Sequence, residues 1–182
     1  SKRWLPQPTI YSSLRTQSGE LRQAKWKDVD LDAALWSIPA EVMKMREPHL
    51  VPLSTQAVAI LREMEPFSSH LEHVFPGGRD PKRPMSDAAI NAAMRRLGIN
   101  TQTELTGHGF RAMARTILHE HLNYPPEVIE VQLAHKAPGP LGAAYARAKF
   151  IEQRKEMMQA WADYLGKIKA GAEIVPFRSE AA

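Results

Sequence analysis

The hydrophobic pattern of this chain changes once, near residue 54, and that change constrains the fold more than any other feature. Between residues 29 and 53, apolar side chains alternate with polar ones in short runs, as in half-buried strands. After residue 54 the apolar positions recur at spacings of three and four, which is typical of helices that bury one face. The sequence therefore predicts an α+β fold, mainly α-helical, with a small three-stranded antiparallel sheet.

Residues 29–31, 34–39 and 49–53 are the expected strands. Residues 30–32 would form the turn between the first two, and the charged segment 41–48 would form a hairpin loop before the third. A short helix over 19–26 would precede the sheet, with its apolar side chains facing inward.

Capping residues and prolines mark the later helices. Pro66 is expected to end the first of them. A core-facing stripe is expected on the helix after Thr106, made of Phe110, Met113, Ala114, Ile117 and Leu118. A last helical stretch should cover 141–165. The other helices are expected to begin after Ser54, Ser86, Thr106 and Pro125.

Composition favours one globular domain. Of the 182 residues, 43% are hydrophobic and 24% charged, which separates the chain from disordered and membrane proteins. We expect an irregular segment over 1–18, the domain over 19–165, and a polar tail over 166–182. Neither a run of about 20 apolar residues nor a signal-peptide core is present. These features favour a cytoplasmic protein without membrane association.

Charge and cysteine content narrow the classes of function. The net charge of +4 and the pI near 9.4 favour an anionic partner. The sequence has no Cys, so disulfides and thiolate metal sites are excluded. His70 with His73, and His119 with His121, have spacings that zinc ligands use, but no third ligand accompanies either pair. We therefore expect neither a metal nor a cofactor.

Five residues, in a fixed order, carry groups that suit a phosphodiester. Lysine and arginine are cations, histidine donates hydrogen bonds or moves protons, and tyrosine can act as a covalent nucleophile. On a helix, a histidine and an arginine three residues apart share one face and can contact the same phosphate. A lysine carries a proton that it can give to a departing oxygen. The five are Lys44, His108, Arg111, His135 and Tyr145.

The motifs around these residues resemble the catalytic domain of the tyrosine recombinases, the phage integrase family, and most closely the integrases of prophages and genomic islands. The resemblance runs from about residue 19 to residue 165. It rests on the segments GELRQAKW at 19–26, MKMREPHLVPLS at 43–54, HGFR at 108–111 and LAH at 133–135, followed by Tyr145. It implies the tyrosine recombinase catalytic-domain fold and site-specific DNA recombination that integrates or excises a mobile element.

The resemblance also implies a role for each residue. Tyr145 would attack the scissile phosphate and form a 3′-phosphotyrosyl link. Arg111 would stabilise the transition state together with His108 and His135, and Lys44 would protonate the leaving 5′ oxygen. The implied partners are double-stranded DNA at attachment sites, further copies of the chain in a homotetramer, and accessory DNA-bending proteins. A DNA-binding domain would precede the catalytic domain, and the protein would be associated with the bacterial nucleoid.

One position departs from the family pattern. The family places a second arginine three residues before the acid of its first motif; here the acid is Glu20 and that position is Gln17. Three explanations stay open: Arg15 takes the place of the arginine, the sequence before residue 19 has been altered, or the chain is a DNA-binding remnant of an integrase with impaired catalysis. A helical transcription regulator is a further alternative, although the sequence offers no clear helix-turn-helix for it.

Overall fold

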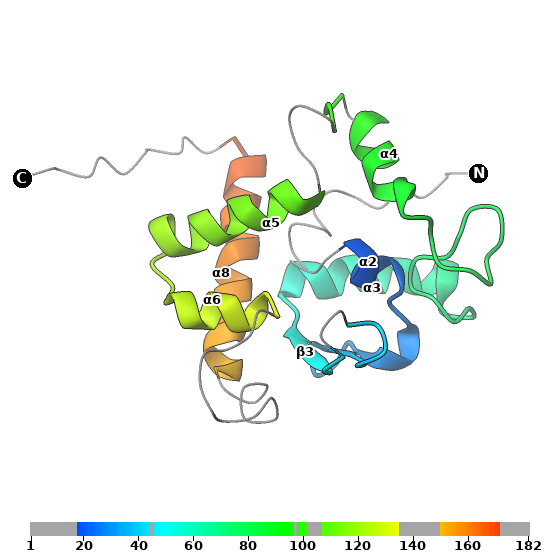
Figure 1. The fold of residues 1–182 in the computed structure, drawn as a ribbon, viewed down its shortest axis with the longest axis horizontal. Coiled ribbons are helices and arrows are strands. Elements are labelled where there is room, and N and C mark those ends of the chain that lie inside the picture. Colours follow the sequence, from blue (N-terminus) through cyan, green and yellow to red (C-terminus); the bar gives the residue numbers. More distant parts are fainter. Residues whose placement is uncertain (1–17, 44–45, 97, 102–106, 135–149, 172–182) are drawn as a thin grey trace, which may run out of the picture.

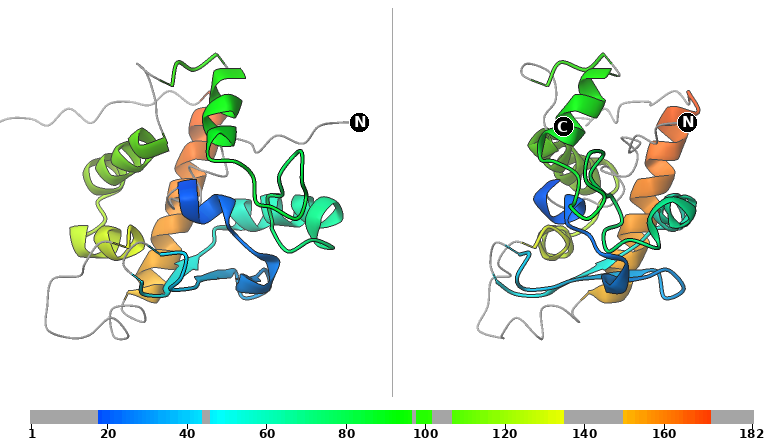
Figure 2. Two further views of the ribbon diagram at one scale, coloured as in Figure 1. Left: turned by 45° about the vertical axis from the view of Figure 1, so that its right-hand side comes forward. Right: turned by 90° about the vertical axis from the view of Figure 1, so that its right-hand side faces the viewer.

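The structure is a computed structural model that describes residues 18–43, 46–96, 98–101, 107–134 and 150–171. It is mainly helical, with one small antiparallel sheet, as the sequence predicts (Figure 1). Helices α5, α6 and α8 gather on one side of the molecule, and the sheet lies with α2 and α3 on the other (Figures 1 and 2).

The sheet has the strand order β1-β2-β3, with both pairs antiparallel. Its strands are Val29–Asp30, Leu35–Ile38 and His49–Pro52, which confirms the three predicted strands. Trp36 on β2 lies opposite Val51 on β3, and both side chains are buried. The alternation seen in the sequence therefore sets which face of the sheet enters the core.

The turn between β1 and β2 forms where it was predicted. The Asp30 carboxylate accepts hydrogen bonds from the main-chain nitrogens of Asp32 at 3.1 Å and Ala33 at 2.8 Å. An aspartate that bonds its own backbone two and three residues on stabilises a tight turn.

Helix α3, Thr55–Ser68, begins at the predicted cap but does not end at Pro66. The Ser54 hydroxyl accepts a hydrogen bond from the amide three residues on, at 3.2 Å. Pro66 lies inside the last turn, and the buried Ser68 hydroxyl donates to the Val74 carbonyl oxygen at 2.8 Å. The prediction of an earlier end was wrong because tertiary hydrogen bonding holds a turn in which proline removes one helical bond.

The other helices follow the predicted order. Helix α8 runs to Lys169, past the expected end at residue 165. Residues 1–17, 135–149 and 172–182, which include the expected N-terminal segment and most of the tail, lie outside the described residues. The described helices are not long and apolar enough to cross a membrane. Their bounds are Ser18–Arg22 for α2, Trp26–Asp28 for η1, Ala88–Arg96 for α4, Gly107–Thr116 for α5, Ile117–His121 for η2, Pro126–Gln132 for α6 and Ile151–Lys169 for α8.

Buried apolar residues form two separate cores. The first, which we call the sheet core, lies between the sheet and helices α2, α3 and α4; the helical core lies between α5, η2, α6 and α8. Trp36 is central to the first and Trp161 to the second. Ala114 and Leu118 enter the helical core as predicted, but Met113 is 38% exposed, so its assignment to the stripe was wrong. Ala114 and Leu118, one turn apart, form a narrow buried face, and Met113 lies at the edge of that face.

Candidate active site

Arg111 lies on α5 where the two cores approach each other. Its helix is anchored in the helical core by the buried Ala114, and η2, which follows directly, by the buried Leu118. The Arg111 side chain is half-buried, and its Nη2 donates a hydrogen bond to the main-chain oxygen of Leu133, just after α6. One edge of the guanidinium is thus fixed to the protein. A planar guanidinium held in this way is suited to presenting its remaining N–H groups to an anion.

The surroundings of Arg111 connect it to the beginning of the described chain. Burial lowers the pKa of Arg111 from its ordinary value, and the carboxylates of Glu20 and Glu130 oppose that shift. Glu20 is buried on α2, whereas Glu130 also pairs with Arg115 at 2.6 Å. The motif that begins at residue 19 therefore lies within electrostatic range of Arg111, although 91 residues separate Glu20 from it.

A cleft of about 450 Å³ joins that motif to the hairpin loop. Gly19 and Glu20 line it from α2, and Met43 and Arg46 line it from the loop between β2 and β3. Met43 and Arg46 are the described residues on either side of the segment that contains Lys44. The fold thus brings the flanks of the predicted lysine position to the acidic residue that lies close to Arg111.

The chain leaves α6 in a strained conformation. Ala134 has φ +53°, in the left-handed region, immediately after the carbonyl that accepts from Arg111. An alanine in that region costs about 1–2 kcal/mol, because its Cβ approaches the following carbonyl oxygen. Such strain persists where surrounding contacts fix the backbone. The next residue in the sequence is His135, which lies outside the described residues.

The structure describes the five predicted site residues to different extents. Arg111 is described in full. The backbone of His108 lies in the first turn of α5, three residues before Arg111, and its side chain is outside the described part of the structure. Lys44, His135 and Tyr145 lie outside the described residues. The roles assigned to all five stay predictions.

A buried polar group beside Arg111 was not predicted from sequence. It consists of His49 on β3, Gln132 at the end of α6, and Arg154 on α8. His49 Nε2 lies 3.3 Å from the Gln132 main-chain oxygen. Burial, together with the positive charges of Arg154 and Arg111, lowers the pKa of His49 to about 4 against the opposing effect of the hydrogen bond to Gln132. His49 is therefore neutral at pH 7 and donates from Nε2 to that carbonyl.

One sequence signal could have revealed part of this group. Arg154 lies three and four residues before Met157 and Met158, and seven before Trp161, all of which are buried. A charged residue on the apolar stripe of a helix is a candidate for a buried polar contact. His49 and Gln132 give no comparable signal, since single polar residues at strand and helix ends are common.

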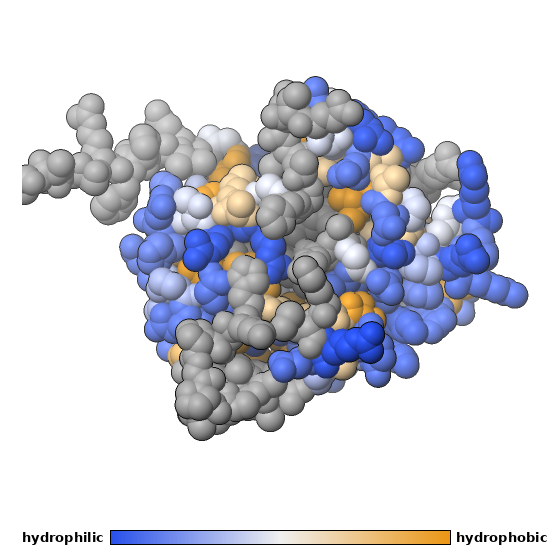
Figure 3. All heavy atoms as spheres, in the orientation of Figure 1, coloured by the Kyte–Doolittle hydropathy of each residue, from blue (hydrophilic) through white to orange (hydrophobic). Residues whose placement is uncertain are grey.

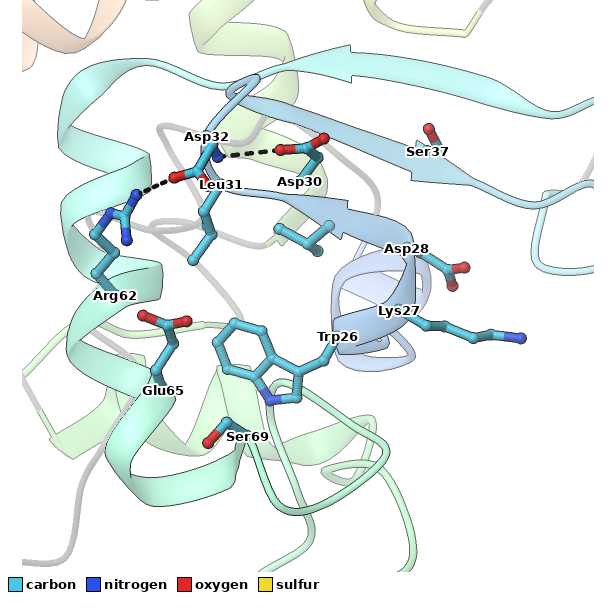
Figure 4. A pocket seen from close by; sticks show the side chains of 11 residues that line it. Trp26, Lys27, Asp28, Asp30, Leu31, Asp32, Ser37, Arg62, Glu65 and Ser69 are labelled. Atoms are coloured by element: carbon cyan, nitrogen blue, oxygen red, sulfur yellow. Dashed lines mark hydrogen bonds and ion pairs between the residues drawn. The ribbon is translucent and has the colours of Figure 1, made fainter.

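A larger hollow, of about 640 Å³, is chemically unsuited to a phosphate (Figure 4). Asp28, Asp30, Asp32 and Glu65 line it, against two cations. One of those cations, Arg62, already pairs with Asp32 at 2.7 Å. Acidic walls repel an anion. The cleft of about 450 Å³ also carries two carboxylates, Glu20 and Glu41, against Arg46, so it is the better candidate for the predicted motifs that border it and not for its charge.

Exposed cations lie away from that cleft as well. Hydrophilic residues cover most of the described surface on the face drawn in Figure 3. Arg79, Lys82 and Arg83 are exposed on the loop between Phe75 and Pro84, which closes through a hydrogen bond from Gly77 N to Arg83 O at 2.7 Å. A closed loop that carries three cations suits contact with a polyanion.

Comparison with known proteins agrees with the fold and the arrangement of motifs. The model of the phage integrase family matches residues 10–152. The chain therefore belongs to the phage integrase family, as its motifs predicted.

Individual relatives include integrases of prophages and phages. The chain is 40% identical to prophage integrase IntA of Escherichia coli (strain K12) over 165 residues, which cover 91% of this chain and 39% of that protein. It is 41% identical to the integrase of Enterobacteria phage P4 over 162 residues, covering 82% of this chain and 37% of that protein. The chain thus spans about two fifths of the length of these relatives.

Solved structures share the fold at low identity. An integrase from mycobacterium phage Brujita aligns with a TM-score of 0.61 and 18% identity, over 96% of this chain and 53% of that one. The XerA recombinase aligns with a TM-score of 0.58 and 17% identity, over 91% of this chain and 56% of that one. A λ integrase dimer bound to a COC′ core site aligns with a TM-score of 0.51 and 17% identity, over 70% and 49%.

Proposed function

We propose that this chain is the catalytic domain of a tyrosine recombinase that cuts and rejoins double-stranded DNA, and so integrates or excises a prophage or genomic island. Membership of the phage integrase family and the names of the relatives support this reading. The solved λ integrase on its core site supports duplex DNA as the class of substrate.

One observation carries the proposal. Segments far apart in the sequence meet around Arg111: Glu20 from the first motif, and the Leu133 carbonyl two residues before His135. The cleft that Glu20 lines also receives Met43 and Arg46, on either side of the Lys44 segment. The flanks of three motifs thus lie together, and chemistry shared between motifs requires this arrangement.

In the proposed reaction, the Tyr145 hydroxyl loses its proton to solvent, its oxygen bonds to the scissile phosphorus, and the bond from phosphorus to the 5′ oxygen breaks. Arg111, with His108 and His135, stabilises the charge that develops on the phosphate oxygens. Lys44 gives a proton to the departing 5′ oxygen. The 3′-phosphotyrosyl link conserves the phosphodiester energy, so the reverse attack by a 5′ hydroxyl rejoins a strand without a metal or a nucleotide cofactor.

A suicide substrate tests this proposal. Duplex DNA with a nick beside the scissile phosphate should trap a covalent adduct that migrates slowly on a denaturing gel. Tyr145→Phe should abolish the adduct and leave the DNA affinity nearly unchanged, because only the nucleophilic oxygen is lost. Tyr164→Phe is the matched control: Tyr164 stacks on Trp161 with ring centroids 6.1 Å apart, and the substitution keeps that ring. An adduct that persists in Tyr145→Phe would show that another residue is the nucleophile.

Gln17 gives specific support to a second candidate function, a DNA-binding remnant that has lost catalysis. If residue 17 is the position of the missing arginine, Gln17→Arg should increase the yield of adduct by restoring positive charge to the transition state. If Arg15 already supplies that charge, Gln17→Arg should change little and Arg15→Ala should remove activity. A chain that binds DNA but forms no adduct in either background would favour the remnant.

Binding to DNA should depend strongly on salt. For a number Z of neutralised phosphates, log affinity should fall with log salt at a slope of about −0.9Z. The exposed Arg79, Lys82, Arg83, Arg95 and Arg96 are candidate contacts. Assembly into a tetramer on two aligned duplexes, with accessory DNA-bending proteins, belongs to the same proposal and can be measured by the mass of the protein–DNA complex.

A further inference from the structure

Arg154 is the most deeply buried cation of the described chain. Its side chain, on α8, has no exposed surface. The Nε atom donates to the Gln132 side-chain oxygen at 2.8 Å, and Nη2 donates to the main-chain oxygen of Leu50 on β3. One guanidinium on α8 thus forms hydrogen bonds with both the end of α6 and strand β3.

No carboxylate among the described residues pairs with this charge. Burial lowers the pKa of Arg154 to about 10, so the group remains a cation at neutral pH. A buried charge without a counter-ion costs free energy, and an apolar side chain of similar volume often packs a helix equally well or better. Arginine, unlike an apolar residue, has a planar guanidinium whose N–H donors hold two acceptors in fixed positions relative to each other.

The two acceptors lie beside the contacts that surround Arg111. Leu50 follows His49, which donates to the main-chain oxygen of Gln132. Leu133 follows Gln132, and its main-chain oxygen accepts from Arg111. Three hydrogen bonds therefore connect residues 49–50 of β3 with Gln132, one directly and two through Arg154. A fourth joins the adjacent Leu133 to Arg111.

We propose that Arg154 is a positioning residue: by holding Leu50 and Gln132 in fixed register, it sets the Leu133 carbonyl that orients Arg111. The inference rests on the proposed function for its effect on DNA cleavage. The same register also fixes two described neighbours of the predicted site segments: β3, which follows the Lys44 loop in the sequence, and the end of α6, which precedes His135.

The cleavage test compares neighbouring variants of the full 182-residue chain. Arg154→Met keeps the bulk of the side chain and removes both donors. Lys155→Met, the matched control, removes an exposed cation that pairs only locally with Glu152 at 2.9 Å. We expect Arg154→Met to lower the single-turnover rate of adduct formation on the order of 10²-fold, the loss typical of a misplacement near 1 Å. The control should stay near wild type, and the Kd for the nicked duplex should change little in both.

Two further variants separate geometry from charge. Gln132→Glu keeps the oxygen that accepts from Arg154 and neutralises the charge; it should retain the wild-type rate within a few-fold. Arg154→Lys keeps the charge but loses the fork, and its rate should fall in the same direction as that of Arg154→Met. If Arg154→Met does not fold, Arg154→Lys replaces it in the comparison with Lys155→Met. If Gln132→Glu formed the adduct slowly and Arg154→Lys formed it at the wild-type rate, the proposal would be overturned in favour of a purely electrostatic role.

An NMR measurement tests the positioning without DNA. The guanidinium signals of Arg111, assigned by their loss in Arg111→Lys, should report a restrained side chain in the wild type and in Lys155→Met. In the Arg154 variants they should move to the averaged positions of exposed arginines. Unchanged Arg111 signals in a folded Arg154 variant would overturn the proposal. If the wild type forms no adduct but the signals respond as expected, the proposed function fails and the positioning stands.

Discussion

The two cores of this molecule are similar in composition and differ in how they are built. The sheet core assembles from residues close in sequence, with β1, β2 and β3 following one another and α3 next. The helical core joins α5 and α6 to α8, with the segment 135–149 between the last two. Local turns and caps therefore contribute to the order of the first core, whereas the second depends on contacts that α8 makes with distant elements.

Polar contacts connect the two cores. Hydrogen bonds join β3 to α6 and α8, and α3 to α8, while Ala134 adds an apolar contact. We call this set of contacts the polar seam. Hydrogen bonds fix direction and register, whereas apolar surfaces tolerate sliding, so the seam can place Arg111 accurately between two separately packed units. Its members are His49, Leu50, Gln56, Gln132, Arg154, Gln159 and Asp163.

The largest expected effect falls on the residue between the cores. Arg111→Met should lower the rate of adduct formation by about 10³–10⁵-fold, the loss typical when a phosphoryl-transfer site loses its arginine. Arg115→Met is the matched control, because Arg115 lies one turn later on α5 and pairs with Glu130 at 2.6 Å. Single-turnover cleavage on the nicked duplex measures both. Equal rates for the two variants would remove Arg111 from the site.

Substitution of one tryptophan in each core tests whether the seam couples them. Trp161 is fully buried and Trp36 is 3% exposed. Each change to alanine should lower the free energy of unfolding by about 3–5 kcal/mol. If the seam makes folding cooperative, urea denaturation followed by circular dichroism should show one transition in both variants. Two separated transitions would show that the cores unfold independently.

Acid should weaken the seam through His49. Its pKa is about 4 in the folded protein and near 6.5 when unperturbed, so the unfolded chain takes up a proton first as the pH falls. The contribution of neutral His49 to the free energy of unfolding is fully present above pH 6.5 and is lost as the pH falls toward 4. The loss should be at most about 3 kcal/mol. Urea denaturation at pH 7 and pH 4.5 measures it, and His49→Gln should flatten this part of the profile; an equally steep profile in that variant would exclude His49 as the cause.

The smallest effect should lie within the sheet core. Ser68 is fully buried, accepts a hydrogen bond from Trp26 Nε1 at 3.2 Å and donates to Val74 O at 2.8 Å. Ser68→Ala leaves those two groups without a partner and should cost about 1–3 kcal/mol. Ser69→Ala, at the exposed next position, should cost almost nothing. Equal thermal midpoints for the two variants would contradict the structural role given to Ser68.

Most of the fold could be predicted because its signals are local. The strands, the Ser54 cap and the turn at Asp30 each depend on residues within a few positions. The seam could not be predicted, since Arg154 and Leu50 are 104 residues apart and His49 and Gln132 are 83 apart. Arg111 was identified from its motif, but nothing in that motif indicates that the Leu133 carbonyl orients it.

Two contacts of the polar seam, and the contact that Arg111 makes beside it, end on main-chain oxygens, and this has a consequence for how the sequence can diverge. Arg154 donates to the carbonyl of Leu50, His49 to that of Gln132, and Arg111 to that of Leu133. Every amino acid supplies a carbonyl, so the side chains at positions 50 and 133 can vary with the packing of their own core while the contacts remain. Relatives that differ from this chain at about three positions in five can thus conserve the frame of the site through its donors.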